Sequence, residues 1–190
     1  ERRVRGPEAA GGVRSPGVGK RPPRRPGYAV LARKVARQVH MRLAREAVLN
    51  TPQGVFAVAL RDRVIARNLY LYGEYELDLL WQAATILAAA RAPSDGATPG
   101  RGTVLDIGAN IGTVSIGLLR AGWYRRAIAI EPDPYNFSLL ERNVRLNGLQ
   151  DRVLCLRCAL SDVSGEAEFE QSATNLGDHH LRAERSGPAS

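Results

Sequence analysis

The fold is decided by the stretch Thr103-Val104-Leu105-Asp106-Ile107-Gly108-Ala109-Asn110-Ile111-Gly112. Its apolar start predicts a buried strand that ends in an acid, and its small residues predict a tight turn before a helix beginning near Thr113. Gly108 and Gly112 have no Cβ, so the backbone of this turn can approach a ligand closely. Asn110 tolerates left-handed dihedral angles better than other residues with a side chain. The N-terminus of the helix would then offer free N–H groups to an anionic group.

The sequence of this turn also indicates which kind of nucleotide ligand the site could bind. It has neither the Gly-x-Gly-x-x-Gly spacing of a dinucleotide site nor the Gly-Lys-Ser/Thr ending of a Walker loop. It carries Asp106 instead, and a carboxylate at this place would repel a pyrophosphate but suits a ligand with an ammonium and a sulfonium group. We therefore expect S-adenosylmethionine as the cofactor.

A second predicted strand, Ala127 to Glu131, also ends in an acid, 25 residues after Asp106. An acid at about this distance binds the ribose diol in nucleotide-type folds, and Glu131 can accept hydrogen bonds from both hydroxyl groups. A single acid at a strand end can simply cap the next helix. Two acids and two glycines on consecutive strand ends favour a ligand site.

The following helix has clear boundaries, with Asp133 as N-cap, Pro134 at its first position and Gly148 after its end. We expect one apolar side of it to face the sheet, through Phe137, Leu140 and Val144. A third strand, Arg152 to about Cys158, should end beside the first two, where an adenine would follow its ribose. The predicted cofactor-binding residues are Asp106, Gly108, Ala109, Asn110, Gly112, Glu131, Pro132, Asp133, Ala159 and Leu160.

Cys155 and Cys158 form a Cys-x-x-Cys pair that is open to a redox or zinc interpretation. On an extended strand, residues three apart point to opposite faces, so we expect two buried, inert thiols and no metal site. The pair His179-His180 lies in a polar stretch, and we expect both rings to be solvated. No general base is assigned, and Asp162, His179 and His180 are only nearby candidates.

The N-terminal half is less regular. Residues 1–27 are rich in Pro, Gly and Arg and predict a disordered tail. A helix over 29–49 would place Val35, Val39 and Leu43 on one side and Arg33, Arg37 and Arg45 on a basic side, for which we favour solvent over a membrane or a nucleic acid. Two strands are expected at 54–60 and 63–66 across a turn at Arg61-Asp62, then a helix over 75–90 and a linker over 93–100.

The charge of the 190-residue chain is +8, but it is unevenly placed. Residues 1–50 hold 13 of the 27 Lys and Arg and 3 of the 19 Asp and Glu, a net charge of +10, so the remainder is −2. Two cysteines cannot make a disulfide scaffold, and no apolar run reaches the length of a membrane span. We expect a cytoplasmic protein without a transmembrane segment.

Several motifs together resemble the FkbM family of S-adenosylmethionine-dependent methyltransferases: the 103–112 stretch, Ala129-Ile130-Glu131-Pro132-Asp133-Pro134, Asn143 with Leu146-Asn147-Gly148-Leu149, Ala159-Leu160-Ser161-Asp162 and Asn175-Leu176-Gly177. Upstream, Leu69-Tyr70 and Tyr72-Gly73-Glu74-Tyr75-Glu76 extend the resemblance, which covers about 54–182. It implies a Rossmann-like α/β methyltransferase fold and methylation of a hydroxyl group on a sugar, polyketide or other small metabolite.

The resemblance also implies a fourth strand, with an acidic segment, that this chain does not contain. We therefore expect a fragment of a longer polypeptide, with three strands of an incomplete parallel sheet and an unpaired edge on the first. The expected division is a tail over 1–27, a helix, hairpin and helix over 28–100, and the first half of the cofactor domain over 101–190. Two alternatives stay open, a catalytically incompetent cofactor-binding module and a nucleic-acid methyltransferase that uses the basic tail.

Overall fold

The computed structural model describes residues 26–90, 102–162, 169–170 and 180–181. An N-terminal part contains α1 (Gly27–Leu43), the strands β1 (Glu46–Thr51) and β2 (Gly54–Ala59), α2 (Ile65–Tyr72) and α3 (Leu77–Ala90). The sheet part contains β3 (Thr103–Ile107), α4 (Thr113–Arg120), β4 (Arg126–Ile130), α5 (Pro134–Leu146) and β5 (Val153–Leu156). Two short strands, β6 (Phe169–Glu170) and β7 (His180–Leu181), pair antiparallel to each other.

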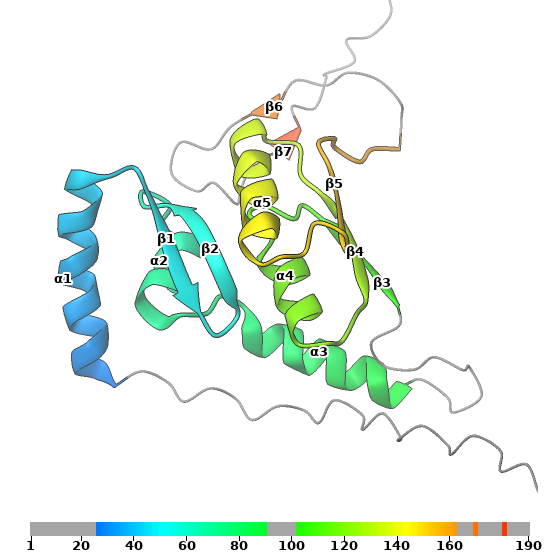
Figure 1. Ribbon diagram of the computed structural model, residues 1–190, viewed down its shortest axis with the longest axis horizontal. Helices are drawn as coiled ribbons and strands as arrows, with labels where there is room; N and C mark the ends of the chain where they lie inside the picture. Colours follow the sequence, from blue (N-terminus) through cyan, green and yellow to red (C-terminus); the bar gives the residue numbers. More distant parts are fainter. Residues whose placement is uncertain (1–25, 91–101, 163–168, 171–179, 182–190) are drawn as a thin grey trace, which may run out of the picture.

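The strands β3, β4 and β5 form a parallel sheet in that order, as the sequence predicts (Figure 1). Each connection crosses over through a helix, the βαβ arrangement of Rossmann-like α/β folds. The register pairs Ile107 with Ile130 and Ile130 with Leu156, so the carboxyl ends of the three strands lie side by side. The predicted beginning of α4 at Thr113 and the predicted N-cap of α5 are both confirmed.

The hairpin differs from the expectation. The predicted long helix ends at Leu43, and residues 46–51 pair with 54–59 around the turn Pro52-Gln53. The segment 63–66, expected as a strand, instead leads into α2, which begins at Ile65. Asp62 explains the difference, because its Oδ1 accepts hydrogen bonds from the backbone N–H groups of Val64 and Ala66 at 2.7 and 3.2 Å. It therefore caps a helix instead of turning a hairpin.

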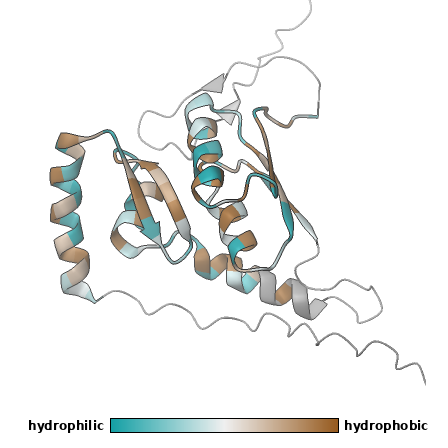
Figure 2. Ribbon diagram, in the orientation of Figure 1, coloured by the Kyte–Doolittle hydropathy of each residue, from teal (hydrophilic) through white to brown (hydrophobic). Residues whose placement is uncertain are grey.

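The orientation of α1 is opposite to the expected one. Its basic side faces the protein: Arg33 donates to the backbone oxygen of Tyr70 at 2.7 Å, and Arg37 donates to those of Leu60 and Asp62. Its apolar side is exposed, with Val35 at 60% and Val39 at 51%. Figure 2 shows hydrophobic bands in brown along this helix. The backbone carbonyl groups near the ends of the hairpin and of α2 accept hydrogen bonds from these guanidinium groups. The free energy of these bonds outweighs what burial of the valines would contribute.

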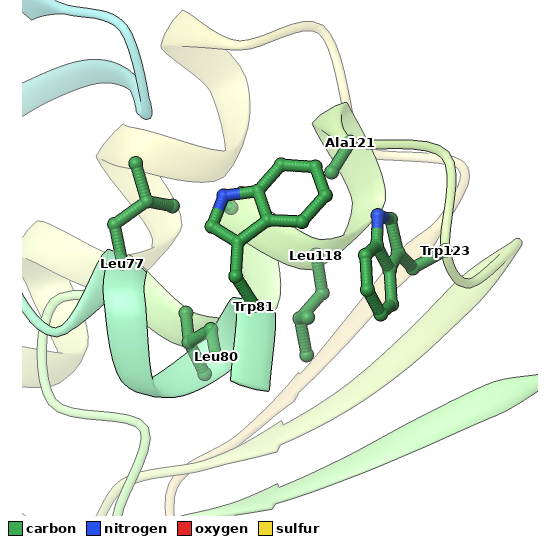
Figure 3. A pocket seen from close by; sticks show the side chains of 7 residues that line it. Leu77, Leu80, Trp81, Leu118, Ala121 and Trp123 are labelled. Atoms are coloured by element: carbon green, nitrogen blue, oxygen red, sulfur yellow. The ribbon is translucent and has the colours of Figure 1, made fainter. Parts of the chain in front are cut away.

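Helix α3 begins close to the predicted position, and its apolar side contacts α4. Trp81 meets Trp123 edge to face, with ring centroids 4.9 Å apart and planes at 82° (Figure 3). Leu77, Leu80 and Leu118 line the same apolar contact. The predicted linker that follows α3 lies outside the described residues.

One core connects the hairpin to the sheet. Its fully buried side chains include Phe56 of β2, Leu69 of α2, Ile116 of α4 and Leu140 of α5. Leu140 and Val144 are buried as predicted, and Phe137 packs half-buried against the core. The hairpin thus lies against the helices that cover one face of the parallel sheet.

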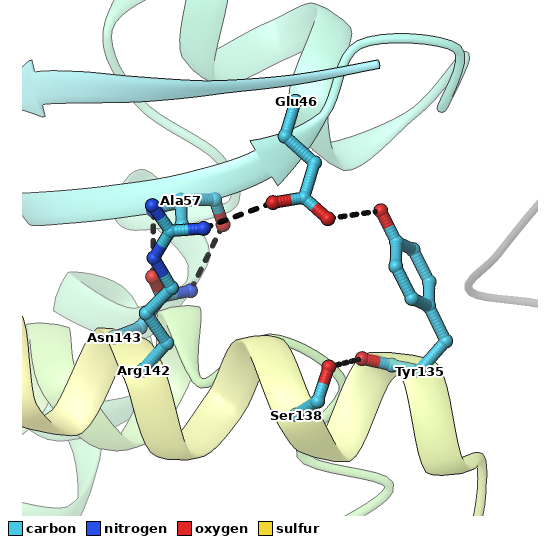
Figure 4. A network of polar contacts seen from close by, with 6 residues as sticks. All are labelled: Glu46, Ala57, Tyr135, Ser138, Arg142 and Asn143. Atoms are coloured by element: carbon cyan, nitrogen blue, oxygen red, sulfur yellow. Dashed lines mark hydrogen bonds and ion pairs between the residues drawn. The ribbon is translucent and has the colours of Figure 1, made fainter.

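Two asparagines, Asn143 of α5 and its C-cap residue Asn147, complete the edge of β2. Asn143 accepts from the N–H of Ala57 at 2.6 Å and donates to its oxygen at 3.2 Å (Figure 4). Asn147, one turn later, makes the same pair of hydrogen bonds with Val55, at 3.0 and 2.7 Å. Residues four apart on a helix share a face, and residues two apart on a strand share an edge. The two amides therefore substitute for a neighbouring strand.

Candidate functional site

The turn after β3 has the predicted geometry. Its three left-handed residues are Gly108, Asn110 and Gly112, with φ of +75°, +50° and +86°. The N–H groups of Gly108 and Ala109 both donate to the backbone oxygen of Ile130 at 2.9 Å. The turn is therefore attached to the end of β4, and the two strand ends form one site.

The two glycines have different roles. A Cβ on Gly108 would meet no atom within 4 Å, so this side of the turn is open. A Cβ on Gly112 would lie 2.7 Å from Cδ1 of Leu140. Gly112 is therefore required for the packing of the turn against α5, whereas Gly108 leaves room for a ligand to approach the backbone.

Asp106 is held by the helix that follows it. Its Oδ2 accepts from the backbone N–H of Ser115 at 3.1 Å and from the Ser115 hydroxyl at 2.6 Å. The side chain is 8% exposed, and burial raises the pKa of the carboxyl group, although the bonds from Ser115 oppose that rise. Asp106 therefore caps α4. The N–H of Ser115, the third residue of α4, is therefore not free to bind a ligand.

Glu131 joins three parts of the site. Its Oε2 accepts from the N–H of Asn110 at 2.8 Å, and its Oε1 accepts from the N–H of Asp133 at 2.9 Å. The side chain is 4% exposed. These two bonds from backbone N–H groups fix the orientation of the carboxylate. Asp133 in turn caps α5, accepting from the N–H of Asn136 at 2.7 Å.

The other predicted residues lie around these two acids. Ala109 is buried in the turn, and Pro132 is half-buried between Glu131 and Asp133. Ala159 and Leu160 are exposed in the segment that follows β5. The backbone oxygen of Leu156, the last residue of β5, accepts a hydrogen bond from the N–H of Glu131 at 3.0 Å. The site therefore brings the strand ends β3 and β4 into direct contact, with β5 beside them.

The surroundings of the three candidate bases, Asp162, His179 and His180, do not identify any of them as a general base. Asp162 is exposed and accepts from the Ser161 hydroxyl at 3.1 Å. His179 lies outside the described residues, and His180 is described only as a backbone position in β7.

Three residues hold the end of β3 and the turn after it in place, and the sequence patterns predict no site role for any of them. Gln53 donates to the backbone oxygen of Thr113 at 2.9 Å and accepts from the N–H of Tyr75 at 3.1 Å. Asn143 donates to the oxygen of Ile111 at 2.9 Å. Ser115, described above, completes the set. No local signal distinguishes Gln53, since a polar residue in a hairpin turn is unremarkable until the fold brings it to α4.

The thiols are only partly as expected. Cys155 is half-buried, and burial raises its pKa to about 11, so it is an unreactive thiol. Cys158 was predicted to be buried but is exposed, because β5 ends at Leu156 and the sheet covers nothing beyond it. Within the part of the chain described above, no group of three or more His, Cys, Asp or Glu side chains could hold a metal ion. In the same residues, no helix is long and apolar enough to cross a membrane.

Comparisons with known proteins agree with a methyltransferase-type domain. Residues 91–178 match the family described as the TRM5/TYW2 methyltransferase domain. Methyltransferase sdnD of Sordaria araneosa is 30% identical over 121 residues, which are 63% of this chain and 42% of that protein. The chain thus spans about two fifths of this curated relative. FkbM is a different branch of methyltransferases from the family that matches.

Three solved structures illustrate the similarity of the fold. The structure of P. horikoshii TYW2 with MeSAdo is 21% identical, with a TM-score of 0.43 over 64% of this chain and 39% of that one. The structure of M. jannaschii TYW2 with AdoMet is 18% identical, with a TM-score of 0.43 over 63% and 46%. The M. jannaschii tRNA m1G37 methyltransferase is 18% identical, with a TM-score of 0.39 over 59% and 28%.

Proposed function

We propose that this chain carries the S-adenosylmethionine site of a methyltransferase, formed at the carboxyl ends of β3 and β4. The observation that supports it most is Glu131, a buried carboxylate that two backbone N–H groups hold beside the glycine turn. The open side of Gly108 lies in the same turn. A fixed acceptor next to an accessible backbone is what binding of a nucleoside requires, so the residues present fit the cofactor.

Each residue of the site has a separate task in this proposal. Glu131 accepts from the ribose hydroxyl groups, and Gly108 admits the ligand to the backbone. Asp106 holds the start of α4 through Ser115 and supplies negative charge near a cationic ligand. When bound, S-adenosylmethionine supplies a methyl group on a cationic sulfur. The chain's contribution is then to orient that ligand toward an acceptor. Residues 101–190 remain our proposed first half of the cofactor domain.

The acceptor is a finer question with two candidates. The FkbM resemblance favours a hydroxyl group on a small metabolite. The TRM5/TYW2 family match favours RNA, since a solved complex of aTrm5 with tRNALeu is among the similar structures. The charge of +10 over residues 1–50 also suits RNA, because phosphate contacts supply most of the affinity for nucleic acids. We propose RNA as the acceptor class and the metabolite hydroxyl as its rival.

Isothermal titration with S-adenosylmethionine tests the cofactor site. We expect Glu131→Gln to weaken binding by about tenfold or more, because a charged acceptor of two hydrogen bonds becomes a neutral one. Glu46→Gln is the matched control, since Glu46 lies on β1, where it binds Tyr135 and Arg142. Equal affinities of the wild-type protein and Glu131→Gln, with both folded by circular dichroism, would refute the assignment.

Transfer of a radiolabelled methyl group tests the acceptor. The protein is incubated with labelled cofactor and either bulk tRNA or a mixture of sugars and polyketide alcohols. Label that nuclease releases from the tRNA supports RNA, and label in the alcohol fraction supports the rival. Cofactor binding without transfer to either supports the module that binds but does not catalyse.

A further inference from the structure

A basic groove lies between α1 and α2, on the N-terminal part of the chain. It has a volume of about 380 Å³, and Lys34, Val35, Arg37, Gln38, Arg67 and Leu71 line it. Three of these six residues are cations and one is an amide that can donate hydrogen bonds. The groove belongs to different elements from the strand ends of the proposed cofactor site.

Arg37 is the unusual member of this lining. It is 9% exposed, and one terminal nitrogen of its guanidinium donates to the backbone oxygens of Leu60 and Asp62. Its Nε–H is buried and has no hydrogen-bond partner among the described residues. A buried N–H without an acceptor is unfavourable, and more so on a charged group. Arg37 thus lines the groove and carries a buried donor that the described residues do not satisfy.

The charges around Arg37 are incompletely balanced. Burial lowers the pKa of the Arg37 guanidinium, and the positive charge of Arg67 lowers it further, while Asp62 acts in the opposite direction. The Oδ1 atom of Asp62 already caps α2. Lys34, Arg37 and Arg67 against this one acid leave two positive charges at the groove. A phosphate carries nearly two negative charges at neutral pH, whereas a carboxylate carries one.

We propose that this groove is a binding site for a phosphate group, with Arg37 and Arg67 as its principal ligands. Arg37 would donate its Nε–H, and Arg67 and the exposed Lys34 would supply charge from the side of the solvent. Arginine suits this task because its fixed N–H geometry matches phosphate oxygens. The phosphate could be free or part of a nucleic-acid backbone, where it carries one negative charge instead of nearly two, and in both cases its oxygens accept hydrogen bonds from the guanidinium groups.

The test uses the whole 190-residue chain and the Nε–Hε resonances of its arginines in proton–nitrogen correlation spectra. Inorganic phosphate is titrated at constant ionic strength, with sodium chloride as the balancing salt. We expect the Arg37 Nε–Hε signal to shift and saturate. Arg67→Gln should weaken the phosphate affinity about fivefold or more. Arg42→Gln is the matched control, because Arg42 is exposed on α1 and does not line the groove, and it should change the affinity less than twofold.

A second titration separates the two sources of phosphate. A single-stranded RNA eight-mer that displaces phosphate, with an affinity that depends on Arg67, identifies a backbone phosphate as the ligand. An eight-mer that leaves bound phosphate in place identifies free phosphate or a small phosphoester. Absence of a saturable Arg37 shift, or equal losses in Arg67→Gln and Arg42→Gln, would overturn the proposal. Because no cofactor and no methyl transfer enter these measurements, the result is independent of the methyltransferase proposal.

Discussion

At the scale of single residues, Asp106 stabilises the fold, and in the proposed function the same carboxylate also serves a ligand. Its bonds from Ser115 fix the start of α4, and burial raises the pKa of the carboxyl group despite them. An acid whose pKa is raised by folding is stabilised in its protonated form, so its ionisation opposes folding. The charge of Asp106 therefore costs stability, and this cost is consistent with a role in binding a cationic ligand.

Two substitutions separate the cap from the charge. Asp106→Asn keeps an acceptor for Ser115 and removes the charge, so we expect a free energy of unfolding at pH 7 equal to or above that of the wild type. Asp106→Ala removes the cap and should cost about 1–2 kcal/mol. Urea denaturation between pH 7 and pH 4 provides the check. The wild type should gain stability relative to Asp106→Asn on acidification, as the carboxylate becomes protonated, and a relative loss would contradict the sign.

At the scale of elements, α5 determines where the hairpin lies. Asn143 bonds to both backbone groups of Ala57 and also to the oxygen of Ile111 in the glycine turn. One fully buried side chain thus connects β2, α5 and the proposed cofactor site. The exposed contacts of Glu46 with Tyr135 and Arg142 join the same two elements at their surface (Figure 4).

The buried and exposed connections should differ strongly in their energies. Asn143→Ala leaves buried polar groups of Ala57 and Ile111 without partners, and we expect a loss of about 2–4 kcal/mol of unfolding free energy. Glu46→Gln should cost less than about 1 kcal/mol, because exposed ion pairs contribute little. Denaturant titration of both variants gives the comparison, with Asn50→Ala on the exposed side of β1 as the control for Asn143→Ala. Similar losses in all three would exclude Asn143 as the main connection.

At the scale of the whole molecule, the sequence predicts the sheet well and the hairpin poorly. Strand ends, the Asn110 turn and the Asp133 cap depend on local chemistry, and their signals lie within a few residues. The strand β1 depends on pairing with β2, and the other edge of β2 bonds to the amides of Asn143 and Asn147 about 90 residues later. No local pattern records these contacts. The orientation of α1 likewise depends on the distant carbonyl groups of Leu60, Asp62 and Tyr70.

Apolar side chains on one face of the parallel sheet are exposed among the described residues, and this has a measurable consequence. Leu105 and Leu154 are each 56% exposed and Ile107 is 60% exposed, although parallel sheets are normally covered on both faces. We expect the 190-residue chain to bind the dye 1-anilinonaphthalene-8-sulfonate in its folded state, because contiguous exposed apolar surface binds such dyes.

The double substitution Leu105→Lys with Leu154→Lys should reduce the dye fluorescence at least about twofold while the far-ultraviolet circular dichroism stays unchanged. Val48→Lys, at an equally exposed position on β1, is the control and should leave the fluorescence near that of the wild type. Dye binding that persists in the double variant would mean that the exposed surface lies elsewhere. In that case the apolar side of α1 would be the next surface to change, with Val35→Lys.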